Sequence, residues 1–497
     1  MKLNTGTLIA LFISTIAVLL ILYARINIIF SYHPDTGGLE YELIYEIQRL
    51  LSNVPLYSDS SAPPFLITQK TPLYHLIVYF LATCIGMTAD NVYQLFVLSG
   101  VFTFTMVLSV CYLCYKIARQ NFELLISPSI LFSACALCIM SHSHHYHSRM
   151  DVVYLFLFLL VYFLLNKCNW KLSSYSMFLS VLFSVLLFYT KQNGLVIIPL
   201  FSLTFLYYQQ DLKLILCYFI SSIFVILLLP FFSTADVNLF YQNIFLGISN
   251  GISFTVIKEF FSSEFQLLFI FHAFISLYFL YKKKNEIPHV SILIGFTLFS
   301  FLLGTIMSFK YGAGLNYFTE FKLLSCLVII ITVFNHQISF PFFDKIKTPF
   351  LVTFLLLTSL MGVKQYYTSA LRFSYQSNAN DFLQNKEIKN FVTTQSSDKS
   401  TDYVYIFVPG FATNFFHREV LLPTKSVFTP SFESDKENSA QLMKLQKYLK
   451  ENIATYLILP DSKNVLTVDL YGYTFEQYAL LKNINNQAIY QYISIKK

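Results

Sequence analysis

Long apolar runs separated by short polar segments fill the first 367 residues of the chain. Many of these runs approach the roughly 20 residues that a helix needs to cross a lipid bilayer. The pattern predicts about eleven membrane-spanning helices, at residues 7–30, 91–117, 123–141, 151–166, 174–190, 194–209, 213–232, 264–281, 289–309, 320–337 and 348–367. The predicted fold class is a polytopic α-helical membrane protein.

Two segments of the first external loop, residues 31–90, predict helices that lie in the membrane interface. Residues 39–51 have an amphipathic helical pattern. Residues 72–87 are apolar but span only about 16 positions, too few to cross the bilayer. This second segment also opens with Pro72 and carries His75, so we expect it to lie along the outer face.

Basic residues follow alternate apolar runs, and this asymmetry predicts the topology. An odd number of spans with a cytoplasmic N-terminus places the C-terminal region outside. Asn-x-Ser/Thr sequons are absent from the predicted external loops, which favours a bacterial inner membrane over the endoplasmic reticulum. The loops predicted to be cytoplasmic carry Lys116, Arg119, Lys167, Lys171, Lys213, Lys282, Lys283, Lys284, Lys345 and Lys347.

Residues 368–497 differ in composition, because apolar density falls and charged and small polar residues appear together. Helical spacing over 381–392 and 439–453 alternates with strand-like runs at 403–408, 455–459 and 489–495. We therefore predict two domains: a transmembrane domain over 1–367 and a small extracytoplasmic α/β domain over 368–497.

Composition agrees with a membrane protein, since 55% of residues are hydrophobic and only 12% are charged. The net charge of +7 comes from loop lysines and arginines, so it gives no reason to expect a nucleic-acid partner. All eight cysteines lie in or beside apolar segments. They are expected to be small packing residues rather than a zinc or redox site.

An acidic residue of the first external loop is the first candidate for chemistry. Asp35 lies shortly after the first span, and a carboxylate at the rim of a low-dielectric cavity can act as a general base. Alternatively, Asp35 caps the helix that begins at Leu39, whose N-terminus Glu40 and Glu42 favour. The residues alone leave both interpretations open.

Four cations lie in separate predicted external loops, against the positive-inside bias. They are Lys70, Arg149, Lys191 and Lys310. Asp151 follows Arg149 at the mouth of a span, where a charge is costly unless it is paired or used. This distribution is expected if several loops converge on an anionic ligand, although Lys70 can also be an interface anchor. The loop after Lys310 adds an amide, a phenol and a carboxylate, from Asn316, Tyr317 and Glu320.

Four histidines lie in the second external loop, residues 142–150. His144 and His147 have the spacing of neighbours on a helical turn, so they are candidates to hold a divalent metal ion. Few acids and no cysteine accompany them, and histidines at an interface also bind phosphate or stay solvated. We name them as candidate metal ligands and expect no other cofactor.

These features together resemble the GT-C class of membrane glycosyltransferases. The shared features are a first span, an acid early in the first external loop, interfacial helices ending in a Lys-x-Pro element, an Arg/Asp pair before the fourth span, a Thr-Lys turn and a soluble outer C-terminal domain. The likeness is to glycosyltransferase family 39, with its lipid A aminoarabinose transferases and protein O-mannosyltransferases. Thr36 stands where the mannosyltransferases carry a second acid, so protein O-mannosylation is disfavoured.

The resemblance implies an inverting transfer of a hexosyl or pentosyl group from a polyprenyl-phosphate donor, on the outer face of the membrane. It implies that Asp35 is the catalytic base, that Lys70 binds the lipid phosphate, and that Asp151 and Lys191 match further site residues. The expected acceptor is a lipid, a glycan or a protein. A surface-polysaccharide polymerase or ligase, and a transporter or flippase of lipid-linked sugar, remain alternatives.

Overall fold

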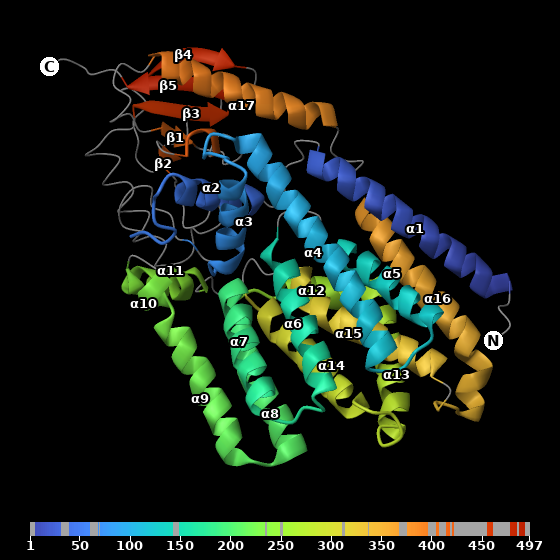
Figure 1. The fold of residues 1–497 in the computed structure, drawn as a ribbon. Helices are drawn as coiled ribbons and strands as arrows, with labels where there is room; N and C mark the ends of the chain where they lie inside the picture. The colour runs from blue at the N-terminus through green and yellow to red at the C-terminus, as the bar shows by residue number, and fades with distance from the viewer. Residues whose placement is uncertain are drawn as a thin grey trace. The chain divides into compact units, whose positions relative to one another are not determined.

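The computed structural model describes residues 5–30, 39–59, 68, 70–142, 149–233, 236–248, 252–310, 314–335, 337–366, 375–395, 404–406, 414–417, 420–421, 455–460, 478–484 and 487–492. Within these ranges, seven helices are long and apolar enough to cross a membrane. They are α1 (Thr5–Phe30), α4 (Val92–Gln120), α6 (Met150–Lys167), α13 (Glu264–Lys282), α14 (Val290–Ser308), α15 (Thr319–Phe334) and α16 (Pro341–Tyr366), all seen in Figure 1.

Shorter helices occupy the remaining predicted spans. These are α5 (Ile126–His142), α7 (Ser174–Thr190), α8 (Ile197–Gln209) and α9 (Leu212–Leu228). Each of the predicted spans therefore coincides with a helix. The two predicted interfacial helices are also present, as α2 (Leu39–Leu51) and α3 (Leu73–Cys84). Short helices complete the described part: η1 (Gln192–Val196), α10 (Pro230–Ser233), α11 (Val237–Ile248), α12 (Thr255–Ser262) and η2 (Leu315–Phe318).

The chain divides into two compact units, and each is built from stretches that are distant in sequence. The first unit comprises residues 1–28, 100–228 and 250–372, and it holds most of the apolar helices. The second comprises residues 29–99, 229–249 and 373–497. The first external loop and the C-terminal region thus belong to the same unit. The predicted domain boundary between residues 367 and 368 remains a prediction.

Aromatic side chains form a core in the first unit around the single tryptophan of the chain. Trp170 is fully buried, and its ring lies 5.3 Å from Phe296 and 5.7 Å from Phe201, centre to centre. Its indole N–H donates a hydrogen bond of 2.7 Å to Asn166 Oδ1, so the one polar atom of the ring has a partner. This core ties α6, α8 and α14 together.

The C-terminal part of the second unit contains a mixed sheet and one long helix. The strands are β1 (Val404–Ile406), β2 (Val420–Leu421), β3 (Tyr456–Pro460), β4 (Tyr478–Ile484) and β5 (Gln487–Tyr492), in the order β2-β1-β3-β5-β4. β1 runs parallel to β2 and β3, whereas β5 runs antiparallel to β3 and β4. Helix α17 (Tyr375–Gln395) lies along this sheet in Figure 1.

Three predicted strands and one predicted helix of this region agree with the structure. β1, β3 and β5 overlap the runs at 403–408, 455–459 and 489–495, and α17 contains the predicted helix at 381–392. The predicted helix at 439–453 lies outside the described residues. β2 and β4 were not predicted.

Candidate functional site

An ion pair that is largely shielded from solvent joins two helix ends of the first unit. Asp151 lies in the first turn of α6, and Lys191 directly follows the last residue of α7. Lys191 Nζ lies 2.5 Å from Asp151 Oδ1, and the two side chains are only 11% and 13% exposed. Two charges so little exposed are stable mainly because they neutralise each other. The pair is the centre of what we call the Asp151 cluster: Asp151, Lys191, Asn316, Tyr317 and Glu320.

The loop before α15 completes this cluster. Asn316 in η2 donates a hydrogen bond of 3.2 Å from its side-chain amide to Asp151 Oδ1. Lys191 Nζ lies 4.6 Å from the centre of the Tyr317 ring, within cation–π range. The predictions that named these residues came from separate loops of the sequence. The structure brings them together in one place.

Gly194 allows the chain to turn directly after Lys191. A side-chain carbon at position 194 would lie 2.3 Å from the backbone carbon of Leu187 and 2.4 Å from the backbone nitrogen of Phe188. Backbone atoms of α7 cannot move aside as a flexible side chain can. Only glycine fits here, so η1 can fold back against the end of α7 while Lys191 faces Asp151.

The pKa values of Lys191 and Lys310, two lysines of this unit, shift in opposite directions. Burial lowers the pKa of Lys191, but the attraction of Asp151, Tyr317 and Glu320 outweighs it and raises the pKa above 10.5. Burial, with repulsion from Lys191, lowers the pKa of Lys310 to about 8. Lys191 is therefore a permanent cation, whereas Lys310 can lose its proton near neutral pH.

A small pocket adjoins the cluster. Tyr317 from η2, Glu320 from the first turn of α15 and Asn193 from η1 contribute polar side chains. Mainly aromatic and aliphatic residues of α6, α8 and α14 form the rest of its wall, with Ser300 among them. The lining residues are Tyr154, Phe158, Asn193, Ile197, Phe299, Ser300, Leu303, Tyr317 and Glu320. A few polar groups on an apolar wall are typical of a small-ligand site.

A second set of charges lies in the second unit, and we call it the α2 network: Glu42, Glu46, Arg49, Lys70 and His75. Lys70 Nζ lies 3.0 Å from Glu42 Oε2. His75 Nε2 lies 2.6 Å from Glu46 Oε2, and both of these side chains are fully buried. The side chain of Lys70 is 12% exposed. The lysine that the sequence singled out is therefore held by a carboxylate of α2.

The pKa values of the two carboxylates in this network shift in opposite directions. Burial and the nearby Glu46 raise the pKa of Glu42 to about 7, although Lys70 opposes this. Burial acts on Glu46 too, but the attraction of Lys70 and His75 prevails and lowers its pKa below 4.5. Near pH 7, Glu46 is therefore ionised, whereas Glu42, the partner of Lys70, exchanges a proton.

The remaining predicted site residues are placed as follows. Glu40 is buried in the first turn of α2, and Arg149 is the residue that precedes α6. Asp35, His144 and His147 lie outside the described residues, so their roles stay predictions. Elsewhere, within the described ranges, no group of three or more His, Cys, Asp and Glu side chains could hold a metal ion.

Sequence reasoning did not name Glu46 or His75 as a pair. The available signal was the spacing Glu42-x-x-x-Glu46, which puts both acids on one helical face. Two acids on the buried face of an interfacial helix need partners. A histidine in an apolar segment, His75, was a second indication, because it also needs a polar partner.

Comparisons with solved structures decide the fold. No protein-family model and no curated protein sequence matches the chain. ArnT from Cupriavidus metallidurans bound to undecaprenyl phosphate matches with a TM-score of 0.56 and 8% identity, over 98% of each chain. The apo oligosaccharyltransferase of Archaeoglobus fulgidus matches with a TM-score of 0.51 and 11% identity, over 91% of this chain and 69% of that one. Both proteins are GT-C glycosyltransferases.

The chain has the GT-C fold. The predicted class, a polytopic helical membrane protein of GT-C type, is thereby confirmed. Apo ArnT from Cupriavidus metallidurans gives a similar match, with a TM-score of 0.55 at 10% identity over 96% of this chain. Within this GT-C fold, the Asp151 cluster and the α2 network are the two concentrations of buried charge that the structure describes.

Proposed function

We propose that this chain is a membrane glycosyltransferase that moves a sugar from a polyprenyl-phosphate donor to an acceptor. The observation that carries the proposal is the GT-C fold over nearly the whole chain, shared with an ArnT that binds undecaprenyl phosphate. The charges that such a ligand needs were predicted from the sequence alone. A polyprenyl tail suits the apolar helices of a multi-pass membrane protein.

Lys70 is the proposed ligand of the lipid phosphate. A lysine ammonium is a compact charge that binds phosphate oxygens well. Lys70 is held 3.0 Å from Glu42 Oε2, and burial with Glu46 nearby gives Glu42 a pKa of about 7. Protonation of Glu42 therefore leaves the Lys70 charge available to an incoming phosphate. Ionised Glu42 therefore competes with the phosphate for Lys70.

The proposed chemistry is an inverting displacement. Asp35 accepts the proton of an acceptor hydroxyl while that oxygen forms a bond to the anomeric carbon. The bond between the anomeric carbon and the phosphate oxygen breaks, and its electron pair leaves with polyprenyl phosphate. Cations stabilise the charge that develops on the departing phosphate, and such stabilisation is usually the largest catalytic contribution.

The Asp151 cluster is proposed to bind polar groups of the reacting sugars. Its carboxylates and the Asn316 amide are arranged to exchange hydrogen bonds with hydroxyls, and Lys191 is fixed in charge. Lys310 and Arg149 are further cations of the first unit that are proposed to bind substrate groups. We place the reaction on the outer face of a bacterial inner membrane, with a lipid, a glycan or a protein as acceptor.

The test is donor turnover by the purified protein in lipid nanodiscs. Polyprenyl-phosphate sugars are supplied one at a time with candidate acceptors, and mass spectrometry follows loss of sugar from the lipid. We expect one donor to be consumed, with Asp35→Asn and Lys70→Ala inactive though normally inserted. If donors cross the bilayer without losing their sugar, the protein is a transporter and the proposal fails.

A further inference from the structure

Helix α2 carries two neighbouring faces with different partners. Tyr41, Tyr45 and Gln48 have the spacing i, i+4 and i+7, which places them in one row along the helix. Glu42, Glu46 and Arg49 repeat that spacing one residue later, about 100° further around the axis. Any rotation of α2 about its own axis therefore moves both rows together.

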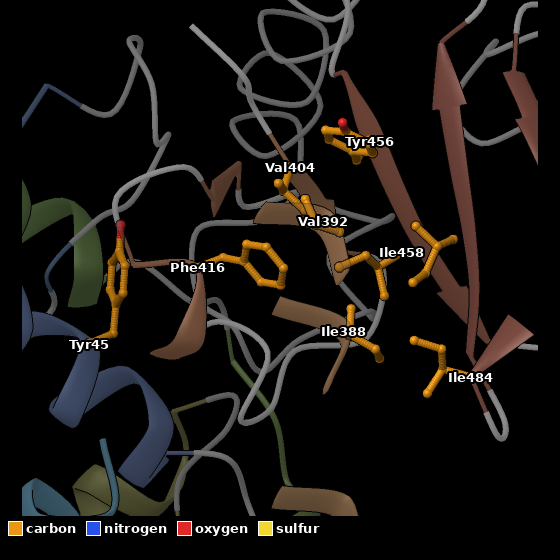
Figure 2. Packing of buried hydrophobic residues seen from close by; sticks show 9 residues of the cluster. Tyr45, Ile388, Val392, Val404, Phe416, Tyr456, Ile458 and Ile484 are labelled. Atoms are coloured by element: carbon orange, nitrogen blue, oxygen red, sulfur yellow. The ribbon is translucent and has the colours of Figure 1, made fainter. Parts of the chain in front are cut away.

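The first row enters the core of the C-terminal part of the second unit. Tyr45 is 1% exposed and packs in a cluster of buried side chains from α17 and the sheet. Figure 2 shows Phe416 lying between Tyr45 and the aliphatic side chains of this cluster. The other members are Ile388, Val392, Val404, Tyr456, Ile458, Ile484 and Ile489. An element of the first external loop thus completes the core of a region more than 300 residues away in the sequence.

Asn414 locks the same row by hydrogen bonds. Its side-chain Nδ2 donates to the backbone oxygen of Tyr41 and to Gln48 Oε1, both at 3.0 Å. Gln48 Nε2 donates in return to the backbone oxygen of Asn414, at 2.9 Å. Asn414 and Gln48 are fully buried. Reciprocal buried hydrogen bonds specify one arrangement, because any other leaves donors unsatisfied.

The second row carries the acids of the α2 network. Glu42 meets Lys70 at 3.0 Å and Glu46 meets His75 at 2.6 Å. Both contacts depend on the rotation of α2, since the carboxylates reach their partners from one helical face. The charged end of Lys70 is thereby placed by a helix that the C-terminal part holds on its adjacent face.

We propose that the C-terminal part positions Lys70 through α2, with Asn414 as the positioning residue. Asn414 fixes the rotation of α2, and that rotation sets where Glu42 holds the ammonium that receives the lipid phosphate. The ligand part of this inference rests on the proposed function. The mechanical part, the fixing of α2 by Asn414, does not.

The test compares three full-length variants in detergent. Asn414→Asp keeps the size of the side chain but removes both donated bonds, and Asn414→Ala removes them without adding a buried charge. Gln384→Glu is the matched control, because Gln384 Nε2 donates a hydrogen bond of 2.9 Å to the backbone oxygen of Ile484, within the C-terminal part itself. Hydrogen exchange of peptides covering α2, and affinity for undecaprenyl phosphate, are measured for each.

We expect exchange of residues 39–51 to accelerate in both Asn414 variants and not in the control. Undecaprenyl phosphate should bind about tenfold more weakly, and a Glu42→Ala background, which keeps Lys70, should abolish that difference, because residues acting through one another are non-additive. A purely structural role would instead lower affinity additively with Glu42→Ala. That result, or unchanged exchange of α2, would overturn the proposal. If the wild type binds no undecaprenyl phosphate, the proposed function fails, and exchange of α2 still decides whether Asn414 fixes the helix.

Discussion

At the scale of single residues, the protein keeps charges in places where water barely reaches them. Lys191 and Asp151 are each about one-tenth exposed, and neither would be stable there alone. Lys310, by contrast, is weakened as a cation by burial and by Lys191, with a pKa of about 8. Lys191 is therefore a fixed charge, whereas the charge of Lys310 responds to pH.

Removing Asp151 should destabilise the first unit more than removing an exposed acid. Asp151→Asn leaves Lys191 without its ion pair at a poorly hydrated site, which costs about 3 kcal/mol. Glu286→Gln is the control, because the pair of Lys283 and Glu286 is exposed and such pairs contribute less than about 1 kcal/mol. Thermal unfolding in detergent measures both. Equal shifts in the melting temperature would contradict the account.

Lys310 should impose an alkaline limit on activity. The transfer rate is expected to fall as pH rises through about 8, since the Lys310 ammonium proposed to bind substrate is then lost. Lys310→Arg keeps its charge, so it should retain activity to about pH 10. The measurement is the pH profile of donor turnover for both proteins. An identical alkaline limb in the arginine variant would assign that limb to another group.

The sequence singled out the residues of the Asp151 cluster but did not show how they pair. Lys191 and Asp151 are 40 positions apart, and Asn316 is 165 positions from Asp151. Such pairing depends on helix packing, which hydropathy does not encode. Glu42 is an example. Its place in the first turn of α2 is explained equally well by a favourable interaction with the helix N-terminus and by pairing with Lys70.

At the scale of elements, the turn after α7 and the helix α2 position the charged groups. The turn depends on Gly194, and α2 depends on partners along two faces. Each makes a prediction of its own.

Gly194→Ala should disrupt the turn that presents Lys191. The added carbon meets backbone atoms at 2.3–2.5 Å, so the end of α7 must shift, at a cost of about 3 kcal/mol or more. Gly295→Ala in α14 is the control, because nothing lies within 4 Å of the added carbon. The control should melt at or above the wild-type temperature. A Gly194→Ala protein as stable and active as that control would contradict the structure of the turn.

Glu42 should make phosphate binding depend on pH. As pH falls through about 7, Glu42 gains a proton and no longer neutralises Lys70, so the contribution of Lys70 to undecaprenyl phosphate affinity increases. Glu42→Gln should bind more tightly above pH 7, and the wild type should approach that affinity at lower pH. The ratio of the two affinities across pH 6 to 8.5, roughly one unit either side of the pKa, is the measurement. A ratio independent of pH would remove Glu42 as the competitor.

Element positions were predicted well where the signal was long. Apolar runs near the length of a membrane span each became a helix, and α2 begins and ends at the predicted residues. β2 and β4 were missed for different reasons. β2 has only two residues, and β4 includes Lys482 and Asn483, so neither shows a clear strand pattern.

At the scale of the whole molecule, stretches distant in sequence share one compact unit. Residues 29–99 group with 373–497 because Tyr45 and Gln48 contact the C-terminal part. A linear reading of composition separates these stretches, since it detects changes along the chain and not contacts across it. The GT-C fold was accessible from the sequence only through the order of its loops and charges.

In this GT-C fold, the proposed polyprenyl-phosphate ligand should be held by Lys70. Native mass spectrometry of the purified protein with undecaprenyl phosphate tests it most directly, with Lys364→Ala on α16 as a control for loss of one lysine. We predict that the wild type and Lys364→Ala retain one lipid per chain and that Lys70→Ala retains none. A wild-type protein that binds no undecaprenyl phosphate, or a Lys70→Ala protein that binds as the wild type does, would contradict the account.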